Sequence, residues 1–132
     1  MLRYLLDTSF CIELLRDKTP SLRRRFAELS DDLCTSTVVL HELMYGVEKS
    51  TKPNENRKRV LEFASRLQVL DFDARAATHA GEIRASLTMR GCQIGAYDIL
   101  IAAHARSLNL AVITGNLREF NRVEGLRCED WS

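Results

Sequence analysis

Short apolar segments alternate with longer stretches of helical periodicity along this chain, and this alternation is the feature that most constrains the fold. Strands separated by helices need crossover connections, so they pair mostly in parallel. The sequence therefore predicts an α/β fold of three layers, in which a mostly parallel central sheet carries helices on both faces. The expected strands cover residues 3–6, 33–36, 68–72, 110–114 and 126–128.

Helix signals fill the segments between these strands. Pro20 and Pro53 suit a first helical turn, Thr37 and Asp73 suit N-caps, and Gly91 suits a helix end. Thr19 is an alternative start for the second helix. The expected helices cover residues 8–16, 19 or 20 to 29, 37–49, 53–67, 74–90, 96–108 and 117–121.

The chain of 132 residues suits one domain, which we expect to span residues 1–132. No apolar run approaches the roughly eighteen residues that a membrane-spanning helix needs. The apolar segment near the N-terminus is short and ends at Asp7, so it does not resemble a secretory signal. These features predict a cytoplasmic protein without a membrane partner.

The charge balance excludes a chain that binds nucleic acid through overall positive charge, because the net charge is only +1. Arginine nevertheless accounts for fifteen of the 19 basic residues. The planar guanidinium group matches phosphate geometry better than the ammonium group of lysine does. This preference weakly favours an anionic partner.

Polar side chains follow two of the predicted strands. Asp7 comes directly after the first strand, and Asn116 and Glu119 follow the strand that ends at Thr114. Ligands of open parallel sheets bind outside the carboxyl ends of the strands. We therefore expect these residues to share one edge of the sheet.

Two further acids lie in apolar helical surroundings. Asp98 precedes the run Ile99–Ala103, and Glu42 lies beside the apolar stripe of its helix. A buried carboxylate must be paired, protonated or bound to a cation, because an isolated buried charge costs on the order of several kcal/mol. Structural alternatives stay open: Asp7 can cap the following helix, Glu42 can pair with an arginine, and Asp98 can interact with a helix dipole.

The candidate acids Asp7, Glu42 and Asp98 predict a metal site. Converging carboxylates repel one another unless a cation neutralises them. A ligand set of hard oxygen atoms without Cys or His favours Mg²⁺, with Mn²⁺ as a substitute, over zinc. Such an ion can activate water and stabilise the charge that develops on a phosphodiester. The acids thus indicate metal-dependent phosphodiester hydrolysis.

Several segments, taken in order, resemble a known family. They are Leu5-Leu6-Asp7-Thr8-Ser9, then Glu42, then Gly95–Ala105 around Asp98, then Val112–Asn116 with Arg118-Glu119-Phe120, and finally Leu126–Trp131. Together they are similar to PIN domains and, within that family, to the VapC toxins of bacterial toxin–antitoxin pairs, in the enteric-type branch. The resemblance covers nearly the whole chain. Each motif alone is weak, whereas their order and spacing are specific.

The resemblance implies a PIN-like fold and a magnesium-dependent endoribonuclease that a cognate VapB-type antitoxin inhibits. Asp7, Glu42 and Asp98 match the metal-binding acids of the family. Members with this pattern cut initiator tRNA in the anticodon loop, so tRNA is the expected substrate. The family also implies a homodimer and a toxin–antitoxin hetero-oligomer, in which an antitoxin side chain, expected to be arginine, enters the acidic site.

Two positions depart from the family pattern. Ser9 stands where the family commonly has Asn, and Asn116 stands where a fourth acid is often found. Either Asn116 completes the site or Glu119 supplies the missing charge. We accordingly expect a single bound ion in the resting protein.

Other functions fit the residues less well. A haloacid-type phosphatase would carry a second Asp where Ser9 stands, and a receiver domain would carry a Lys near Thr114 and Gly115. A third alternative is a catalytically weak PIN-like module that binds RNA or protein. Asn116 is the main support for that alternative.

Overall fold

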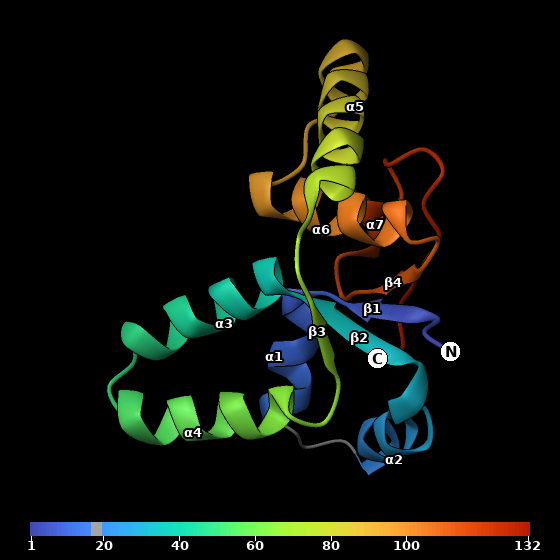
Figure 1. The fold of residues 1–132 in the computed structure, drawn as a ribbon. Helices are drawn as coiled ribbons and strands as arrows, with labels where there is room; N and C mark the ends of the chain where they lie inside the picture. Colours follow the sequence, from blue (N-terminus) through green and yellow to red (C-terminus); the bar gives the residue numbers. More distant parts are fainter. Residues whose placement is uncertain (17–19) are drawn as a thin grey trace.

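The computed structural model describes residues 1–16 and 20–132, whose strands form a five-stranded sheet (Figure 1). The order across the sheet is β3-β2-β1-β4-β5, and every neighbouring pair is parallel. The prediction of a parallel α/β sheet is therefore confirmed. The strands are β1 (Tyr4–Leu6), β2 (Leu33–Ser36), β3 (Gln68–Leu70), β4 (Ala111–Ile113) and β5 (Cys128–Glu129).

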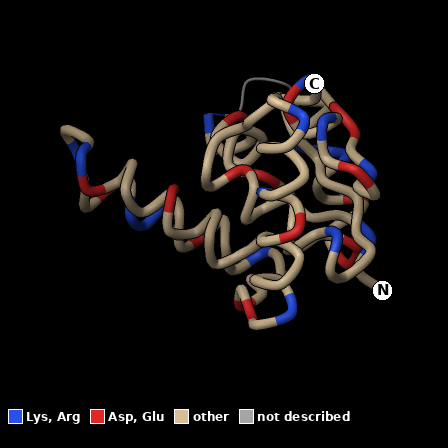
Figure 2. The backbone as a smooth tube through the Cα atoms, turned by 90° about the horizontal axis from the view of Figure 1, so that it is seen from above, with Lys and Arg blue, Asp and Glu red and all other residues tan. Residues whose placement is uncertain are grey.

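Helices lie on both faces of this sheet, as the sequence predicts. Helices α5, α6 and α7 lie on one side, and α1 and α2 lie on the other (Figure 1). The hairpin of α3 and α4 extends away from the sheet (Figure 2). In the described part of the chain, no helix combines the length and apolar character that a membrane crossing requires. The helices are α1 (Thr8–Arg16), α2 (Pro20–Glu28), α3 (Thr37–Glu48), α4 (Pro53–Ala64), α5 (Ala74–Arg90), α6 (Ala96–Ser107) and α7 (Leu117–Phe120), with a short 3₁₀ turn at Ser30–Asp32.

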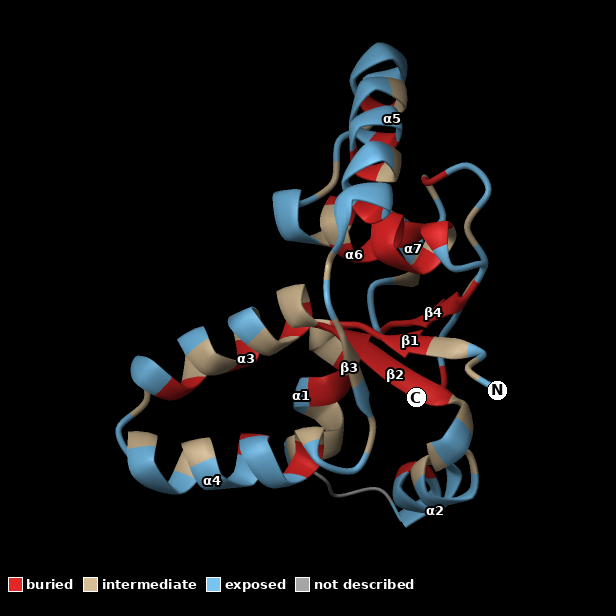
Figure 3. Ribbon diagram, in the orientation of Figure 1, coloured by how far each residue is buried: buried red, intermediate tan, exposed pale blue. Residues whose placement is uncertain are grey.

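The core is centred on the middle strands and on α6 (Figure 3). Strands covered by helices on both faces are apolar on both faces, and Leu5, Leu6, Val112 and Ile113 are all fully buried. Helix α6 is buried nearly all round, because it lies between the sheet and α5. This burial agrees with the continuous apolar run Ile99–Ala103 in its sequence.

Most predicted helix ends match the structure to within one residue, with two corrections. Helix α4 ends at Ala64 rather than at residue 67, because residues 65–67 turn into β3. Asp73 caps α5 by accepting a hydrogen bond from the Ala76 N–H, and Gly91 ends that helix at φ 66°. Thr37 is not the N-cap of α3, because its hydroxyl accepts the Phe72 N–H; Ser36 caps the helix instead, through the Val38 N–H. Thr19, the alternative start of the second helix, lies outside the described residues.

The last strand lies slightly later than predicted. Residues 126–128 were expected, whereas β5 covers Cys128–Glu129. Its position follows from pairing with β4, because the Val112 N–H donates to the Arg127 carbonyl and the Thr114 N–H donates to the Glu129 carbonyl. Register against a neighbouring strand therefore decides this boundary.

Candidate active site

The register of β1 and β4 brings two distant residues together. Leu6 is paired with Ile113 across the two strands, so the next residues, Asp7 and Thr114, leave the sheet side by side. The Asp7 N–H donates to the Ile113 carbonyl at 3.1 Å, which extends the pairing by one step. The carboxyl edge of the central strands thus carries a polar pair, as the position of Asp7 predicts.

The carboxylate of Asp7 is almost fully buried and accepts three sets of hydrogen bonds. Its exposed fraction is 1%. The Phe10 N–H donates at 2.8 Å, the Ser9 hydroxyl at 2.9 and 3.0 Å, and the Thr114 hydroxyl at 2.5 Å. The bond from Phe10 means that Asp7 also caps α1, so the structural alternative and the site role hold together. These contacts fix the carboxylate rigidly.

Burial still outweighs these contacts in setting the charge of Asp7. Removal from water raises the pKa of its carboxyl group, although the bonds from Thr114, Phe10 and Ser9 act to lower it. The negative charge of Glu42 raises this pKa further. Asp7 is therefore a carboxylate that a nearby cation would stabilise.

Asp98 lies in the first turn of α6, facing the same cluster. Burial raises its pKa from 3.8 to about 6, and the charges of Asp7, Glu42 and Glu119 contribute in that order. Asp7, Glu42 and Glu119 are thus near enough for their charges to act on the Asp98 carboxyl group, whereas Asn116 carries no charge that could do so. Asp98 makes no side-chain hydrogen bond within the described residues, in contrast to Asp7.

A glycine next to Asp98 keeps this side of the cluster open. A Cβ atom on Gly95 would lie 3.3 Å from Oδ2 of Asp98. A larger residue at this position would press on the carboxylate. The sequence alone indicates no role for Gly95, because the Asp98 carboxylate that it faces becomes apparent only in the fold.

Glu42 comes from α3 and is linked to the first residue of α1, Thr8. The Thr8 hydroxyl donates to Oε1 of Glu42 at 2.6 Å. Among the described residues, no arginine forms an ion pair with Glu42. The alternative that Glu42 simply pairs with an arginine is therefore wrong for this part of the chain. The three residues that follow β1 thus all serve the acid cluster.

Asn116 and Glu119 occupy different positions near the cluster. Glu119 lies on α7, and its charge acts on Asp98. Asn116 is exposed at the start of α7, and its side chain makes no capping hydrogen bond. Its backbone is tied to the site, because the Asn116 N–H donates to the Thr114 hydroxyl at 2.8 Å. Between the two alternatives, the geometry favours Glu119 as the source of the fourth charge.

Thr114 is the positioning residue that sequence reasoning missed. It is fully buried, donates to Asp7, and accepts from the Asn116 backbone. Ser9 supports the same arrangement, because its hydroxyl also accepts the Gly115 N–H at 3.1 Å. A buried hydroxyl at the end of an apolar strand is the sequence signal that could have identified Thr114.

The donor set suits a hard divalent cation that keeps much of its water. All four clustered side chains are carboxylates, and their proximity raises the pKa of Asp98 in the absence of a positive charge. Among the described residues, no three His, Cys, Asp or Glu side chains stand close enough to hold one ion by themselves. Mg²⁺ commonly binds through one or two carboxylates with water and substrate phosphates completing its shell. The residues therefore fit Mg²⁺ better than a metal that requires a complete protein cage.

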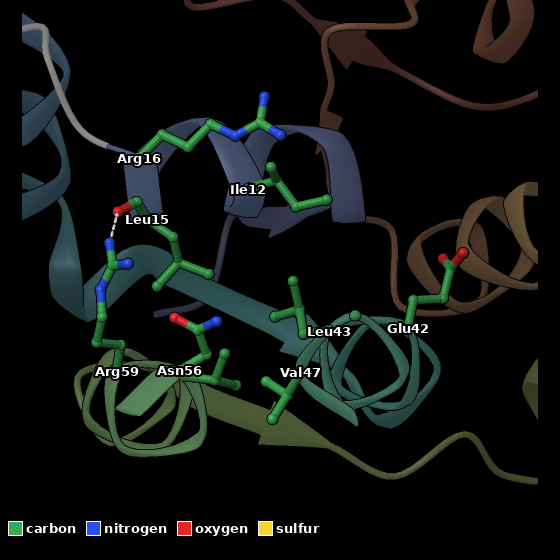
Figure 4. A pocket seen from close by; sticks show the side chains of 10 residues that line it. Ile12, Leu15, Arg16, Glu42, Leu43, Val47, Asn56 and Arg59 are labelled. Carbon is green, nitrogen blue, oxygen red and sulfur yellow. Dashed lines mark hydrogen bonds between the residues drawn. The ribbon is translucent and has the colours of Figure 1, made fainter. Parts of the chain in front are cut away.

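An apolar pocket of about 260 Å³ adjoins the acids between α1, α3 and α4 (Figure 4). Glu42 lines its edge, so pocket and cluster share a boundary. At the other end, the Arg59 guanidinium donates to the Leu15 carbonyl. The remaining lining residues are Ile12, Arg16, Leu43, Gly46, Val47, Asn56 and Val60.

Comparison with known families fits this combination of sheet and acids. The PIN domain model matches residues 4–126, a range that includes every residue of the cluster. The fold and the site thus define the class.

Individual relatives narrow the class further. A protein of Shigella flexneri named tRNA(fMet)-specific endonuclease VapC is 50% identical over 132 residues, which is 100% of both chains. The crystal structure of DNA-bound VapBC from Salmonella typhimurium contains a chain that superimposes with a TM-score of 0.97 at 48% identity, over 100% of both chains. VapBC2 from Rickettsia felis, bound to a DNA fragment of its promoter, gives a TM-score of 0.95 at 35% identity, over 99% of this chain and 100% of that one. The chain therefore belongs to the PIN-domain family and, within it, to the VapC proteins.

Proposed function

We propose that this protein is the toxin of a type II toxin–antitoxin pair and acts as a metal-dependent endoribonuclease. The observation that carries the proposal is the convergence of Asp7, Glu42, Asp98 and Glu119 at the carboxyl edge of the sheet. The name of the Shigella relative, which specifies an endonuclease for tRNA(fMet), supports initiator tRNA as the substrate. We place the cut in the anticodon loop, whose single-stranded bases are open to a protein.

Mg²⁺ is the proposed cofactor, with Mn²⁺ as a substitute. Asp7, Asp98 and Glu42 would hold it together with water and the substrate phosphate, because among the described residues no three such side chains stand close enough to bind an ion by themselves. When bound, the ion would activate a water molecule and stabilise the charge that develops on the phosphodiester. Removal of the ion by a chelator should therefore abolish cleavage.

The chain's own residues orient the acids and control their protons. Thr114, Ser9 and the Phe10 N–H hold the Asp7 carboxylate in one orientation. Asp98 is free of such donors, and its pKa of about 6 allows it to take up a proton just below neutral pH. Burial is the main cause of this raised pKa, and the negative charges of Asp7, Glu42 and Glu119 add to it in that order. The site thus combines a fixed acid with one that responds to its surroundings.

A cognate VapB-type antitoxin is the proposed protein partner. The solved relatives are VapBC assemblies, which supports a complex of the same kind here. The apolar pocket beside Glu42 offers a surface that a partner segment could bury next to the acids. We also propose a homodimer that joins the antitoxin in a hetero-oligomer. Light scattering of the isolated protein and of the co-expressed pair tests both assemblies.

The decisive experiment is cleavage of total tRNA by the purified protein without antitoxin, followed by sequencing of the cut ends. Reactions contain Mg²⁺ or Mn²⁺, with EDTA and the Asp7→Asn variant as controls. One cut in the anticodon loop of initiator tRNA, lost in both controls, supports the enzyme, the metal and the substrate together. RNA binding by the folded protein without cleavage favours the catalytically weak binding module instead. Full activity in EDTA contradicts the metal requirement.

A further inference from the structure

Two aromatic rings contact each other from the helices that carry Glu42 and Asp98, and each ring belongs to the residue that precedes the acid in the chain. His41 precedes Glu42 on α3, and Tyr97 precedes Asp98 on α6. Their ring centroids lie 5.1 Å apart with an angle of 53° between the planes. The N-terminal parts of α3 and α6 face each other in Figure 1, so the ring pair spans the gap between these helices. We call His41 and Tyr97 the aromatic shelf.

The aromatic shelf is open to solvent rather than committed to the core. Tyr97 is 48% exposed, and His41 is also exposed. Within the described residues, the Tyr97 hydroxyl and the His41 ring nitrogens make no hydrogen bond. Tyr4, by contrast, packs edge-on against Trp131 and accepts a hydrogen bond from Arg3. The shelf therefore keeps its ring surfaces and polar atoms available for another molecule.

We propose that the aromatic shelf stacks a base of the nucleotide next to the phosphodiester that is cut. This inference rests on the proposed function and adds a substrate-binding element to it. Carboxylates repel the RNA backbone, so a substrate held beside them benefits from a contact that does not depend on charge. Aromatic side chains provide this contact to single-stranded nucleotides by stacking on their bases.

The geometry gives the two rings different roles in binding the base. Their 53° tilt prevents one flat base from lying against both of them in the same way. Tyr97 has the larger ring and adjoins Asp98 in the chain, where consecutive Cα atoms lie about 3.8 Å apart. Tyr97 therefore carries the base, and His41 supports the tyrosine ring from α3. A base on Tyr97 belongs to a nucleotide that adjoins the acids.

The test uses steady-state cleavage of an RNA stem-loop that contains the mapped cut site. The protein variants are Tyr97→Leu, Tyr97→Phe and His41→Ala. Tyr45→Leu is the matched control, because Tyr45, like Tyr97, is an exposed tyrosine. It lies on α3, one turn after His41, and the Lys49 ammonium lies 4.8 Å from the centre of its ring. The RNA is intact or lacks the base on one side of the cut. Thermal unfolding of each variant confirms that it is folded.

We expect Tyr97→Leu to raise KM about 10-fold while kcat changes less than about twofold, because stacking holds substrate without taking part in the chemistry. Tyr97→Phe keeps the ring and should keep the KM of the unaltered protein. His41→Ala should have a smaller effect. Removal of one flanking base should raise KM for the unaltered protein by a similar factor, and Tyr97→Leu should then cause no further loss.

Several results would overturn the aromatic shelf as a binding element. One is an unchanged KM when either flanking base is removed, which tests the unaltered protein even if Tyr97→Leu does not fold. Another is a Tyr97→Phe variant as impaired as Tyr97→Leu, and a third is an equal loss in Tyr45→Leu. If the unaltered protein neither binds nor cuts the intact RNA, the proposed function fails as well, which separates the two failures.

Discussion

The acid cluster has two halves, which differ in the hydrogen-bond donors that they offer to a carboxylate. In the buried half, Asp7 is enclosed at the end of β1 and receives hydrogen bonds from Ser9, Phe10 and Thr114. In the open half, Asp98 lies on α6 without side-chain hydrogen bonds in the described structure, facing like charges. Burial raises the pKa of both acids. Hydrogen bonds counteract the rise in the first half only.

This difference separates two tasks within one site. The buried half has donors that hold the Asp7 carboxylate in one orientation. In the open half, no positive charge among the described neighbours balances Asp98, so binding of a cation or a proton there lowers the free energy. A fixed carboxylate beside an unbalanced one suits the proposed ion, which the first would position and the second would attract.

The largest expected effect is the loss of activity in Asp7→Asn. The amide keeps an oxygen acceptor for the Phe10 N–H, so the cap of α1 and the fold should persist. The negative charge is gone, and cleavage should fall to the level seen with EDTA. Cleavage assays alongside thermal unfolding check this result. Normal activity in a folded Asp7→Asn protein would falsify the role of the buried half.

The next effect tests whether the donors of the buried half matter for the chemistry. Thr114→Val removes a donor to Asp7 and the acceptor of the Asn116 N–H. We expect activity to fall about 10- to 100-fold, as for groups that orient a metal ligand. The free energy of unfolding should fall by about 1–3 kcal/mol, because the buried Asp7 carboxylate loses a hydrogen-bond donor.

Thr35→Val is the matched control for this variant. Thr35 is a buried threonine on β2 whose hydroxyl donates to the Leu6 carbonyl at 2.7 Å and forms no hydrogen bond with a carboxylate of the described residues. It should lose stability without a comparable loss of kcat. Equal losses of kcat in both variants would mean that Thr114 acts through general stability alone.

The open half should make stability depend on pH when no divalent ion is present. The folded-state pKa of Asp98 is about 6 against an ordinary value of 3.8, so the folded protein binds this proton more tightly than the unfolded chain. Stability from this group is complete below pH 3.8 and is lost as the pH rises through about 6.

Asp98→Asn should remove this dependence. In EDTA at pH 8 we expect the variant to be more stable by about 1 kcal/mol, after solvent screening of a partly exposed group is taken into account. At pH 4 the two proteins should unfold alike. Urea titrations at the two pH values measure the difference. A variant that gains no stability at pH 8 would remove the contrast between the halves.

The smallest effect distinguishes Asn116 from Glu119 as the fourth side chain of the site, beside Asp7, Glu42 and Asp98. Glu119→Gln removes a charge that acts on Asp98, whereas Asn116→Ala removes a side chain without a capping contact. We expect Glu119→Gln to lower the pKa of Asp98 and to require more Mg²⁺ for half-maximal cleavage, and Asn116→Ala to leave both close to normal. NMR titration of the Asp98 carboxyl and a Mg²⁺ titration compare them. The reverse order would assign the position to Asn116.

The sequence predicts much of this architecture because its signals are local. Apolar runs locate the strands, and Asp73 and Gly91 mark the ends of α5 through contacts within a few residues. Thr37 misleads for the opposite reason, since its hydroxyl binds the Phe72 N–H far along the chain. A tertiary contact decides there, and nothing in the local sequence announces it.

The same distinction applies to the site. Asp7, Glu42 and Asp98 could be singled out because acids at strand ends or in apolar helices are unusual, and the structure brings them together. Thr114 and Gly95 were missed, because their roles depend on what lies opposite them. Residues with unusual chemistry are visible in a sequence, whereas residues that position them become visible only with the fold.

The hydrogen bond between Thr114 and Asp7 joins residues 107 positions apart, and this separation has a consequence for synthesis on the ribosome. Asp7 therefore leaves the ribosome 107 residues before its partner Thr114. Until β4 pairs with β1, the nascent chain has an unanchored Asp7 and no complete sheet edge. Under the proposed function, the growing chain therefore lacks its fixed acid, and with it nuclease activity, until β4 has been made.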